Sequence, residues 1–145
     1  MRCSSSTTDG HRVWLSLGSN LGDRYGQISQ AIRRLGETVG PVERQSSLYE
    51  TLPWGFESDH LFVNAAVCCL TSHSPREVLR LTQQIERELG RTSKSAGGHY
   101  SDRPIDIDIL LYDDVTIDEP DLKIPHPLMH ERDFVMKPLN EIKND

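Results

Sequence analysis

Two aspartates one residue apart, Asp106 and Asp108, are the side chains of this sequence best suited to metal chemistry. They lie in the apolar run from Ile105 to Tyr112, which is typical of a β-strand. Residues i and i+2 of a strand point to the same side, about 6.5–7 Å apart, so the two carboxylates repel each other. A divalent cation between them would relieve this repulsion, and a small set of hard oxygen ligands favours magnesium over zinc. The residues taken alone fit equally well the solvent face of an edge strand.

Basic side chains gather in sequence around this pair, although the protein is acidic overall. The 145 residues include 16 Lys and Arg against 22 Asp and Glu, a formal net charge of −6, which argues against a nucleic-acid binder. The basic residues concerned are Arg91, Lys94, His99, Arg103, His126, His130 and Arg132. Arginine grips phosphate oxygens with two parallel N–H donors, so the pattern favours a phosphate-and-metal site, with a solvated charged loop as the alternative. No Gly-x-x-x-x-Gly-Lys-Ser/Thr segment occurs, which excludes a P-loop.

Asn64 is the one polar residue in the otherwise apolar run from Phe62 to Leu70. Its amide offers a donor and an acceptor side by side, which suits a heterocycle with an amide-like edge. Aromatic rings at Phe62, Trp54 and Phe134 could supply flat stacking surfaces for such a ligand. A structural asparagine bonded to a neighbouring strand explains the residue equally well.

Hydrophobic periodicity places these residues on alternating strands and helices. Strands are expected over 13–17, 42–49, 62–70 and 105–112, and helices after residue 23, over 75–89 and briefly near 139–142. Gly36 and Gly40-Pro41 are expected to stop the first helix, and Ser74 with Glu77 predicts a capping box at the second. Gln83 and Glu86 share a face of that second helix and could meet a ligand, although exposed helix polarity is the commoner explanation. The order β-α-β-β-α-β predicts an α+β, ferredoxin-like fold, an antiparallel sheet with helices packed on it.

One domain is expected over residues 12–145, preceded by a disordered polar tail over residues 1–11. Residues 1–10 lack the apolar segment of a secretory signal, and no apolar stretch approaches the roughly 20 residues that span a bilayer. We therefore expect no membrane association. Cys3, Cys68 and Cys69 fit no zinc-site spacing, so we expect reduced thiols and a cytoplasmic protein.

These motifs together resemble the 6-hydroxymethyl-7,8-dihydropterin pyrophosphokinase family over residues 13–142. The matching segments are Leu17-Gly18-Ser19-Asn20-Leu21-Gly22, Tyr49-Glu50-Thr51, Phe62-Val63-Asn64-Ala65-Ala66-Val67, Gln83-Gln84-Ile85-Glu86-Arg87-Glu88-Leu89-Gly90-Arg91, Asp102-Arg103-Pro104-Ile105-Asp106-Ile107-Asp108-Ile109-Leu110, Ile124-Pro125-His126-Pro127 and Arg132-Asp133-Phe134. The resemblance implies an ATP-dependent diphosphokinase of folate biosynthesis. Such an enzyme transfers pyrophosphate from ATP to 6-hydroxymethyl-7,8-dihydropterin and releases AMP.

The resemblance also implies roles for individual residues. Two Mg²⁺ ions would be held by Asp106 and Asp108, which would act in catalysis together with Arg91 and Arg103. The implied ATP-binding residues are Gln83, Arg91, Arg103, Ile109, His126 and Arg132. The implied pterin-binding residues are Thr51, Trp54, Phe62, Asn64 and Phe134. Three segments, 18–24, 51–59 and 92–102, would close over ATP, and ATP and the pterin are the expected partners of a monomer.

Three positions depart from the pattern of the family. His99-Tyr100-Ser101-Asp102 stands where many members carry Trp-Gly-Pro, Ser93 replaces a second basic residue, and Phe62 stands where Tyr is frequent. Two other functions fit the same aspartate pair. One is a magnesium-dependent phosphohydrolase or nucleotidyl transferase, and the other is a nucleotide-sensing module without turnover.

Overall fold

An antiparallel sheet of five strands runs through the middle of the molecule, in the order β2-β4-β1-β5 with β3 also paired to β4. The strands are β1 (His11–Ser19), β2 (Val42–Gln45), β3 (Tyr49–Thr51), β4 (Phe62–Thr71) and β5 (Asp106–Tyr112). The computed structural model describes residues 10–20, 23–51, 62–89, 105–127 and 129–143. The strand order, with a helix after β1 and another after β4, confirms the expected α+β, ferredoxin-like class.

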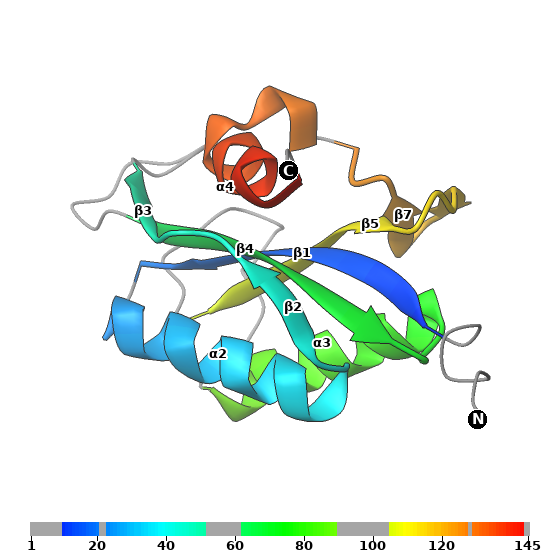
Figure 1. Ribbon diagram of the computed structural model, residues 1–145, viewed down its shortest axis with the longest axis horizontal. Helices are drawn as coiled ribbons and strands as arrows, with labels where there is room; N and C mark the ends of the chain where they lie inside the picture. Colours follow the sequence, from blue (N-terminus) through cyan, green and yellow to red (C-terminus); the bar gives the residue numbers. More distant parts are fainter. Residues whose placement is uncertain (1–9, 21–22, 52–61, 90–104, 128, 144–145) are drawn as a thin grey trace.

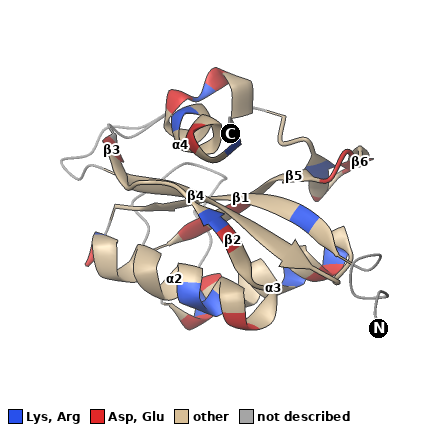
Figure 2. Ribbon diagram, in the orientation of Figure 1, with Lys and Arg blue, Asp and Glu red and all other residues tan. Residues whose placement is uncertain are grey.

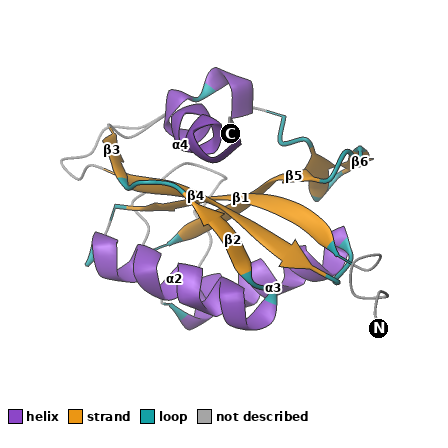
Figure 3. Cartoon of the chain, in the orientation of Figure 1, coloured by secondary structure: helices purple, strands orange, loops and turns teal. Residues whose placement is uncertain are grey.

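Helices cover both faces of this sheet (Figures 1 and 3). α2 (Arg24–Thr38) and α3 (Pro75–Glu88) lie on one face, and α4 (Asp133–Lys143) lies on the other. A hairpin of β6 (Ile117–Glu119) and β7 (Leu122–Ile124) and a short 3-10 helix, η2 (Met129–Glu131), connect β5 to α4. The sheet therefore has two different faces, one toward α2 and α3 and the other toward α4.

Alternating side chains of the strands fill a hydrophobic core on each face. The core toward α2 and α3 includes Val13, Leu15, Leu17, Val63, Ala65, Val67, Cys69, Ile107 and Ile109. The core toward α4 includes Trp14, Ala66, Cys68, Leu110, Val135, Leu139 and Ile142. Cys68 and Cys69 point to opposite faces, as strand periodicity predicts, and both are free and buried.

β5 contains a bulge of one residue at Leu110. Two adjacent residues of β1 pair with Leu111 and Ile109, which leaves Leu110 without a partner in β1. Ile109 faces the α2 and α3 side, whereas Leu110 and Leu111 both face α4, so the alternation of side chains shifts by one residue here. Before the bulge, the regular alternation places Asp106 and Asp108 on the α4 side.

Of the two stop signals expected for the first helix, Gly36 lies inside α2, which continues to Thr38, and Gly40 follows shortly after its end. The interior glycine costs a helix about 1 kcal/mol relative to alanine. Leu35 is fully buried and Val39, which follows the helix, is 2% exposed. Packing of these residues on the sheet outweighs the local penalty.

The expected strand over 42–49 is interrupted at Ser46. Ser46 N donates to Ala66 O, and Ala66 N donates to Ser46 Oγ at 2.9 Å, so this side chain replaces a backbone partner and β3 starts only at Tyr49. The last helix is also longer than expected, because it begins at Asp133 and includes Pro138. Proline is usually a helix breaker, and its presence hid the first half of α4 from sequence reasoning.

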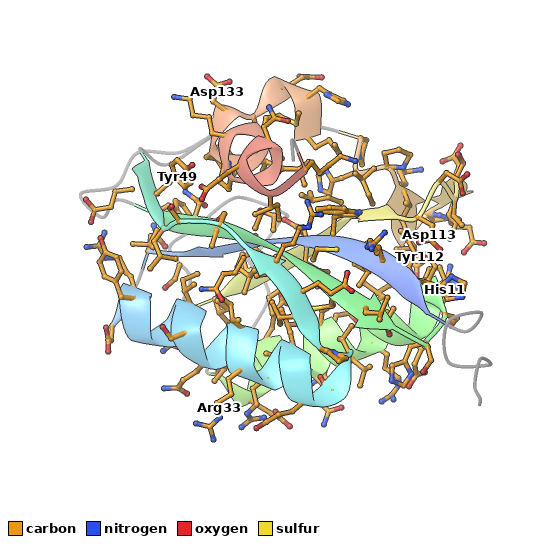
Figure 4. The ribbon with its side chains drawn as sticks, viewed as in Figure 1. His11, Arg33, Tyr49, Tyr112, Asp113 and Asp133 are labelled. Atoms are coloured by element: carbon orange, nitrogen blue, oxygen red, sulfur yellow. The ribbon has the colours of Figure 1, made fainter. Side chains whose placement is uncertain are left out.

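The expected tail boundary at residue 11 falls inside a strand, since His11 opens β1. Asp113 anchors this end of the strand. Its Oδ1 accepts a hydrogen bond from Arg12 N at 2.8 Å, and its Oδ2 lies 2.7 Å from His11 Nδ1. Figure 4 shows His11, Tyr112 and Asp113 gathered at one end of the sheet. Residues 1–9 of the expected tail lie outside the described residues.

Candidate functional site

Asn64 and the two aspartates reach the same face of the sheet from strands far apart in sequence. Gly18 of β1 pairs with Asn64 of β4 on one side and with Asp106 of β5 on the other. Ser16, two residues earlier in β1, pairs with Asp108. Paired residues of antiparallel strands project to the same side, so one amide and two carboxylates point toward the α4 side.

Gly18 is buried, and the side chains of Asn64 and Phe62 lie over the place where its own side chain would project. A Cβ atom at Gly18 would lie 3.1 Å from Asn64 Oδ1 and 3.5 Å from Phe62 Cδ1. Asn64 is 2% exposed, and Phe62 is half-buried. An amide edge and an aromatic ring therefore lie together over Gly18, where a flat polar ligand would meet both.

The half-buried carboxylates of Asp106 and Asp108 suit a magnesium ion. Mg²⁺ commonly takes one or two protein carboxylates and completes its octahedron with water and phosphate oxygens. Within the described ranges, no group of three His, Cys, Asp or Glu side chains forms a closed metal site. Two carboxylates on one face of β5 fit a metal that completes its coordination with water and a phosphorylated substrate.

A buried carboxylate on α3 holds the strand between the two aspartates. Glu86 is 8% exposed, and its Oε2 accepts a hydrogen bond from Ile107 N at 2.7 Å. β5 lies at the edge of the described sheet, so this N–H points away from β1 and needs another partner. Sequence reasoning grouped Glu86 with Gln83, but the structure separates them, because Gln83 is exposed.

His126 and Arg132 approach Asp106 from the connection between β5 and α4. His126 N donates to the carbonyl of Leu110, the bulged residue, at 3.0 Å. Burial lowers the pKa of His126, the charge of Arg132 lowers it further, and Asp106 acts in the opposite direction. The imidazole therefore favours its neutral form. Arg132 is 6% exposed, and its Cζ lies 5.7 Å from the centre of the Phe134 ring.

Phe134 lies in the first turn of α4 and packs beside the core on that face of the sheet. It thus shares the α4 side with Phe62 and Asn64, as the proposed stacking requires. Ile109 differs, because its side chain is 6% exposed and belongs to the core toward α2 and α3. Its side chain is not brought to the face that carries the aspartates.

Several expected site residues lie outside the described part of the chain. These are Trp54, Arg91 and Arg103, together with the segment 92–102 and most of 51–59. The backbone of Thr51 is described and pairs with Phe62 in the β3–β4 ladder. Residues 21 and 22 of the expected loop 18–24 are also outside the described ranges.

Charges of both signs are interspersed over the described elements (Figure 2). On α2, for example, Arg33 Nε lies 3.5 Å from Glu37 Oε2, and Arg33 projects from the outer face of that helix (Figure 4). No described helix is both long and apolar enough to span a membrane. The candidate site is thus identified by its individual residues and not by a large surface patch of positive or negative charge.

A protein-family model described as 7,8-dihydro-6-hydroxymethylpterin-pyrophosphokinase matches residues 14–144. A relative from Porphyromonas gingivalis, named 2-amino-4-hydroxy-6-hydroxymethyldihydropteridine pyrophosphokinase, is 53% identical over 131 residues, covering 90% of this chain and 89% of its own length. A Bacillus subtilis relative of the same name is 46% identical and is covered over 77% of its length. An Aquifex aeolicus relative, again of that name, is 44% identical, with 79% covered.

Among solved structures, wild-type HPPK-DHPS of Plasmodium falciparum with SDX-DHP matches with a TM-score of 0.71. The match covers 92% of this chain and 41% of that longer chain, at 18% sequence identity. At this identity the likeness bears on the fold alone. It agrees with the α+β architecture described above.

Proposed function

This chain belongs to the 7,8-dihydro-6-hydroxymethylpterin-pyrophosphokinase family, and from that premise we propose how its residues divide the work of the reaction. The protein is an ATP-dependent diphosphokinase that transfers pyrophosphate from ATP to hydroxymethyldihydropterin in folate synthesis. The observation that best supports a location for this reaction is the placement of Asn64 and Asp106 on either side of Gly18. The pterin and the phosphates would then meet over the central strand.

The pterin is proposed to bind on the β4 side of Gly18. Asn64 would read the amide-like edge of the heterocycle with its donor and acceptor. Phe62 and Phe134 would stack on the ring, one from the sheet and the other from α4. Thr51 and Trp54 complete the proposed pterin site at the end of β3 and in the segment after it.

The phosphates of ATP are proposed to bind on the β5 side. Asp106 and Asp108 would hold two magnesium ions, which when bound supply positive charge to the phosphate oxygens. The proposed nucleotide-binding residues are Gln83, Arg91, Arg103, Ile109, His126 and Arg132. Because the Ile109 side chain lies in the core toward α2 and α3, Ile109 would contribute through its backbone. Arg132 would contribute a permanent charge, whereas a neutral His126 would contribute a hydrogen bond.

In the reaction, the hydroxymethyl oxygen of the pterin attacks the β-phosphorus of ATP. A new O–Pβ bond forms, the bond from Pβ to the oxygen bridging it to Pα breaks, and AMP leaves with that bonding electron pair. The hydroxyl proton is released in the same process. The protein contributes mainly by holding the two substrates in line and by balancing charge, with Arg91 and Arg103 proposed to act on the transferred group.

AMP formation tests this function directly. The purified protein is incubated with ATP and Mg²⁺, with and without 6-hydroxymethyl-7,8-dihydropterin, and AMP is separated by chromatography. We expect AMP only when the pterin is present. AMP without pterin would instead indicate a phosphohydrolase, and nucleotide binding without AMP in either mixture would indicate a sensing module.

We also propose that the enzyme works as a cytoplasmic monomer that binds neither nucleic acid nor membrane. The free, buried thiols of Cys68 and Cys69 and the net charge of −6 support this proposal. Sedimentation velocity at micromolar concentration should show a single species close to the chain mass of 16.4 kDa. A species of twice that mass would contradict the monomer.

A further inference from the structure

Glu141, near the end of α4, accepts hydrogen bonds from Ser47 and Tyr49 at the start of β3. Tyr49 Oη donates to Glu141 Oε1 at 2.6 Å. Ser47 donates to the same carboxylate from its N at 3.0 Å and from its Oγ at 2.9 Å, both to Oε2. These bonds lower the pKa of Glu141, so it is ionised at neutral pH. Figure 4 shows Tyr49 beside α4.

Tyr49 is also the cross-strand neighbour of Asn64. The two residues pair in the β3–β4 ladder, and Asn64 pairs with Gly18 on its other side. Directly opposed residues of an antiparallel pair have Cβ atoms about 4.5–5.5 Å apart and project to the same side. Because Gly18 has no side chain, Tyr49 supplies the lateral side-chain neighbour of Asn64 within this row of the described sheet.

The Glu141 carboxylate connects Tyr49, and through it the paired residues Tyr49, Asn64 and Gly18, to α4, the helix that carries Phe134. Glu141 lies seven residues after Phe134, two helical turns and about 10.5 Å along the axis. A second bond fixes this end of the helix, since Arg44 Nη1 of β2 donates to Ile142 O at 2.7 Å. The C-terminal half of α4 is thus fastened to β2 and β3, and its first turn carries the ring proposed to cover the pterin.

We infer that the Tyr49–Glu141 pair positions the pterin-reading amide of Asn64 relative to Phe134, and so tunes affinity for the pterin without touching it. The inference rests on the pterin role proposed above for Asn64. β3 has only three residues and pairs with β4 alone among the described strands, so its own ladder holds the Tyr49 ring weakly. Arg24 and Tyr25 of α2 bond Glu50, the next residue of β3, from the opposite side of the sheet, so the bond to Glu141 supplies the restraint on the α4 side.

Tyr49→Phe tests this inference, and Tyr25→Phe is a matched control. Tyr25 Oη also donates to a glutamate, Glu50 Oε2, at 3.0 Å. Glu50 follows Tyr49 in β3, so this control removes a comparable bond to the same strand from α2, on the opposite side of the sheet. Affinities for 6-hydroxymethylpterin and for a nonhydrolysable ATP analogue with Mg²⁺ are measured by calorimetry, alongside the melting temperature. We expect Tyr49→Phe to weaken pterin binding about five- to tenfold, the scale of one lost charge-assisted bond, with ATP affinity changed less than about twofold.

Two further variants separate positioning from general stability. Glu141→Gln keeps an acceptor oxygen for Tyr49 and should retain most of the pterin affinity. Glu141→Ala also removes the bonds from Ser47, so it should weaken pterin binding at least as much as Tyr49→Phe. Equal effects of Tyr49→Phe and Tyr25→Phe, or equal losses for pterin and ATP, would overturn the inference. Asn64→Ala identifies which statement has failed: if it weakens pterin binding and Tyr49→Phe does not, only the positioning role is wrong. If Asn64→Ala leaves pterin binding intact, the proposed pterin site is wrong.

Discussion

Replacing Gly18 with alanine should weaken pterin binding much more than ATP binding. The added methyl carbon would lie 3.1 Å from Asn64 Oδ1, and its next contacts are with the Phe62 ring at 3.5 and 3.8 Å. The first contact is short by a few tenths of an ångström, so the Asn64 amide must rotate or move away. The three nearest atoms all belong to Asn64 and Phe62, which places the perturbation on the proposed pterin side of β1.

The size of the effect follows from what the displaced amide would lose. A donor and an acceptor that both misalign with the pterin lose about 0.5–1.5 kcal/mol each, about 1–3 kcal/mol together, so affinity should fall by about 5- to 150-fold. Folding should suffer less. Overpacking costs about 1–3 kcal/mol in a tight core, and the low end applies here because the nearest atom belongs to a side-chain amide and not to backbone.

Calorimetric titration of Gly18→Ala with the pterin, and separately with a nonhydrolysable ATP analogue and Mg²⁺, measures both affinities. Gly36→Ala is the control, because its new Cβ would meet only Val42 Cγ2 at an ordinary 3.7 Å. Removing a glycine from a helix interior should stabilise the protein by about 0.5–1 kcal/mol and leave both affinities unchanged. Unchanged pterin affinity in Gly18→Ala, or equal losses for the two ligands, would refute the reasoning.

Asp106→Ala and Asp108→Ala should each lower turnover by about 10³-fold or more while the fold survives, and near wild-type AMP production by either variant would contradict the proposed metal role. Glu86→Leu leaves the buried amide of Ile107 unpaired at a cost of about 1–3 kcal/mol, so this variant should melt well below Glu86→Gln, which keeps an acceptor. Equal melting temperatures of the two variants would show that the bond contributes nothing to stability. Burial raises the pKa of Cys68 to about 11 and that of Cys69 to about 12. At pH 8 their thiolate fractions are then about 10⁻³ or less, so peptide mapping after brief iodoacetamide treatment should find both unmodified in native protein and modified after unfolding.

The strands and the pair of aspartates were predictable because each is a local pattern. Alternation in β4 assigned Asn64 and Phe62 to one side, and the i, i+2 spacing put Asp106 and Asp108 on one side of β5. Cys68 lies four residues after Asn64 on the same side of β4, and its place in the core toward α4 confirms the side assigned to it. The side of the sheet that α4 covers could not be read from these patterns, because it depends on the whole topology.

Glu86 and Glu141 show what sequence reasoning missed. Each is a glutamate on a helix, and nothing in the local sequence of Glu141 distinguishes it from a solvated surface residue. Their partners, Ile107 N and Tyr49 Oη, lie 21 and 92 positions away. A signal existed only for Glu86, which adjoins Ile85 on the apolar face of α3, where a carboxylate requires a partner. Pro138 had a different effect: because proline usually ends a helix, the expected α4 was shorter than the observed one.

The bulge at Leu110 makes the length of β5 as important as its composition. The strand is fastened at both ends, with Asp106 in register with Gly18 and Asp113 bonded to the backbone of Arg12. With both ends fixed, the effect of deleting one residue depends on where it is removed. Deleting Leu110 would give a regular ladder with Asp106, Asp108 and Tyr112 on their present sides. Deleting Ile107 would also keep both ends in register, but it would turn Asp108 toward the hydrophobic core over α2 and α3. Relatives that keep both ends should therefore tolerate loss of the bulge residue far more readily than loss of a residue between the two aspartates.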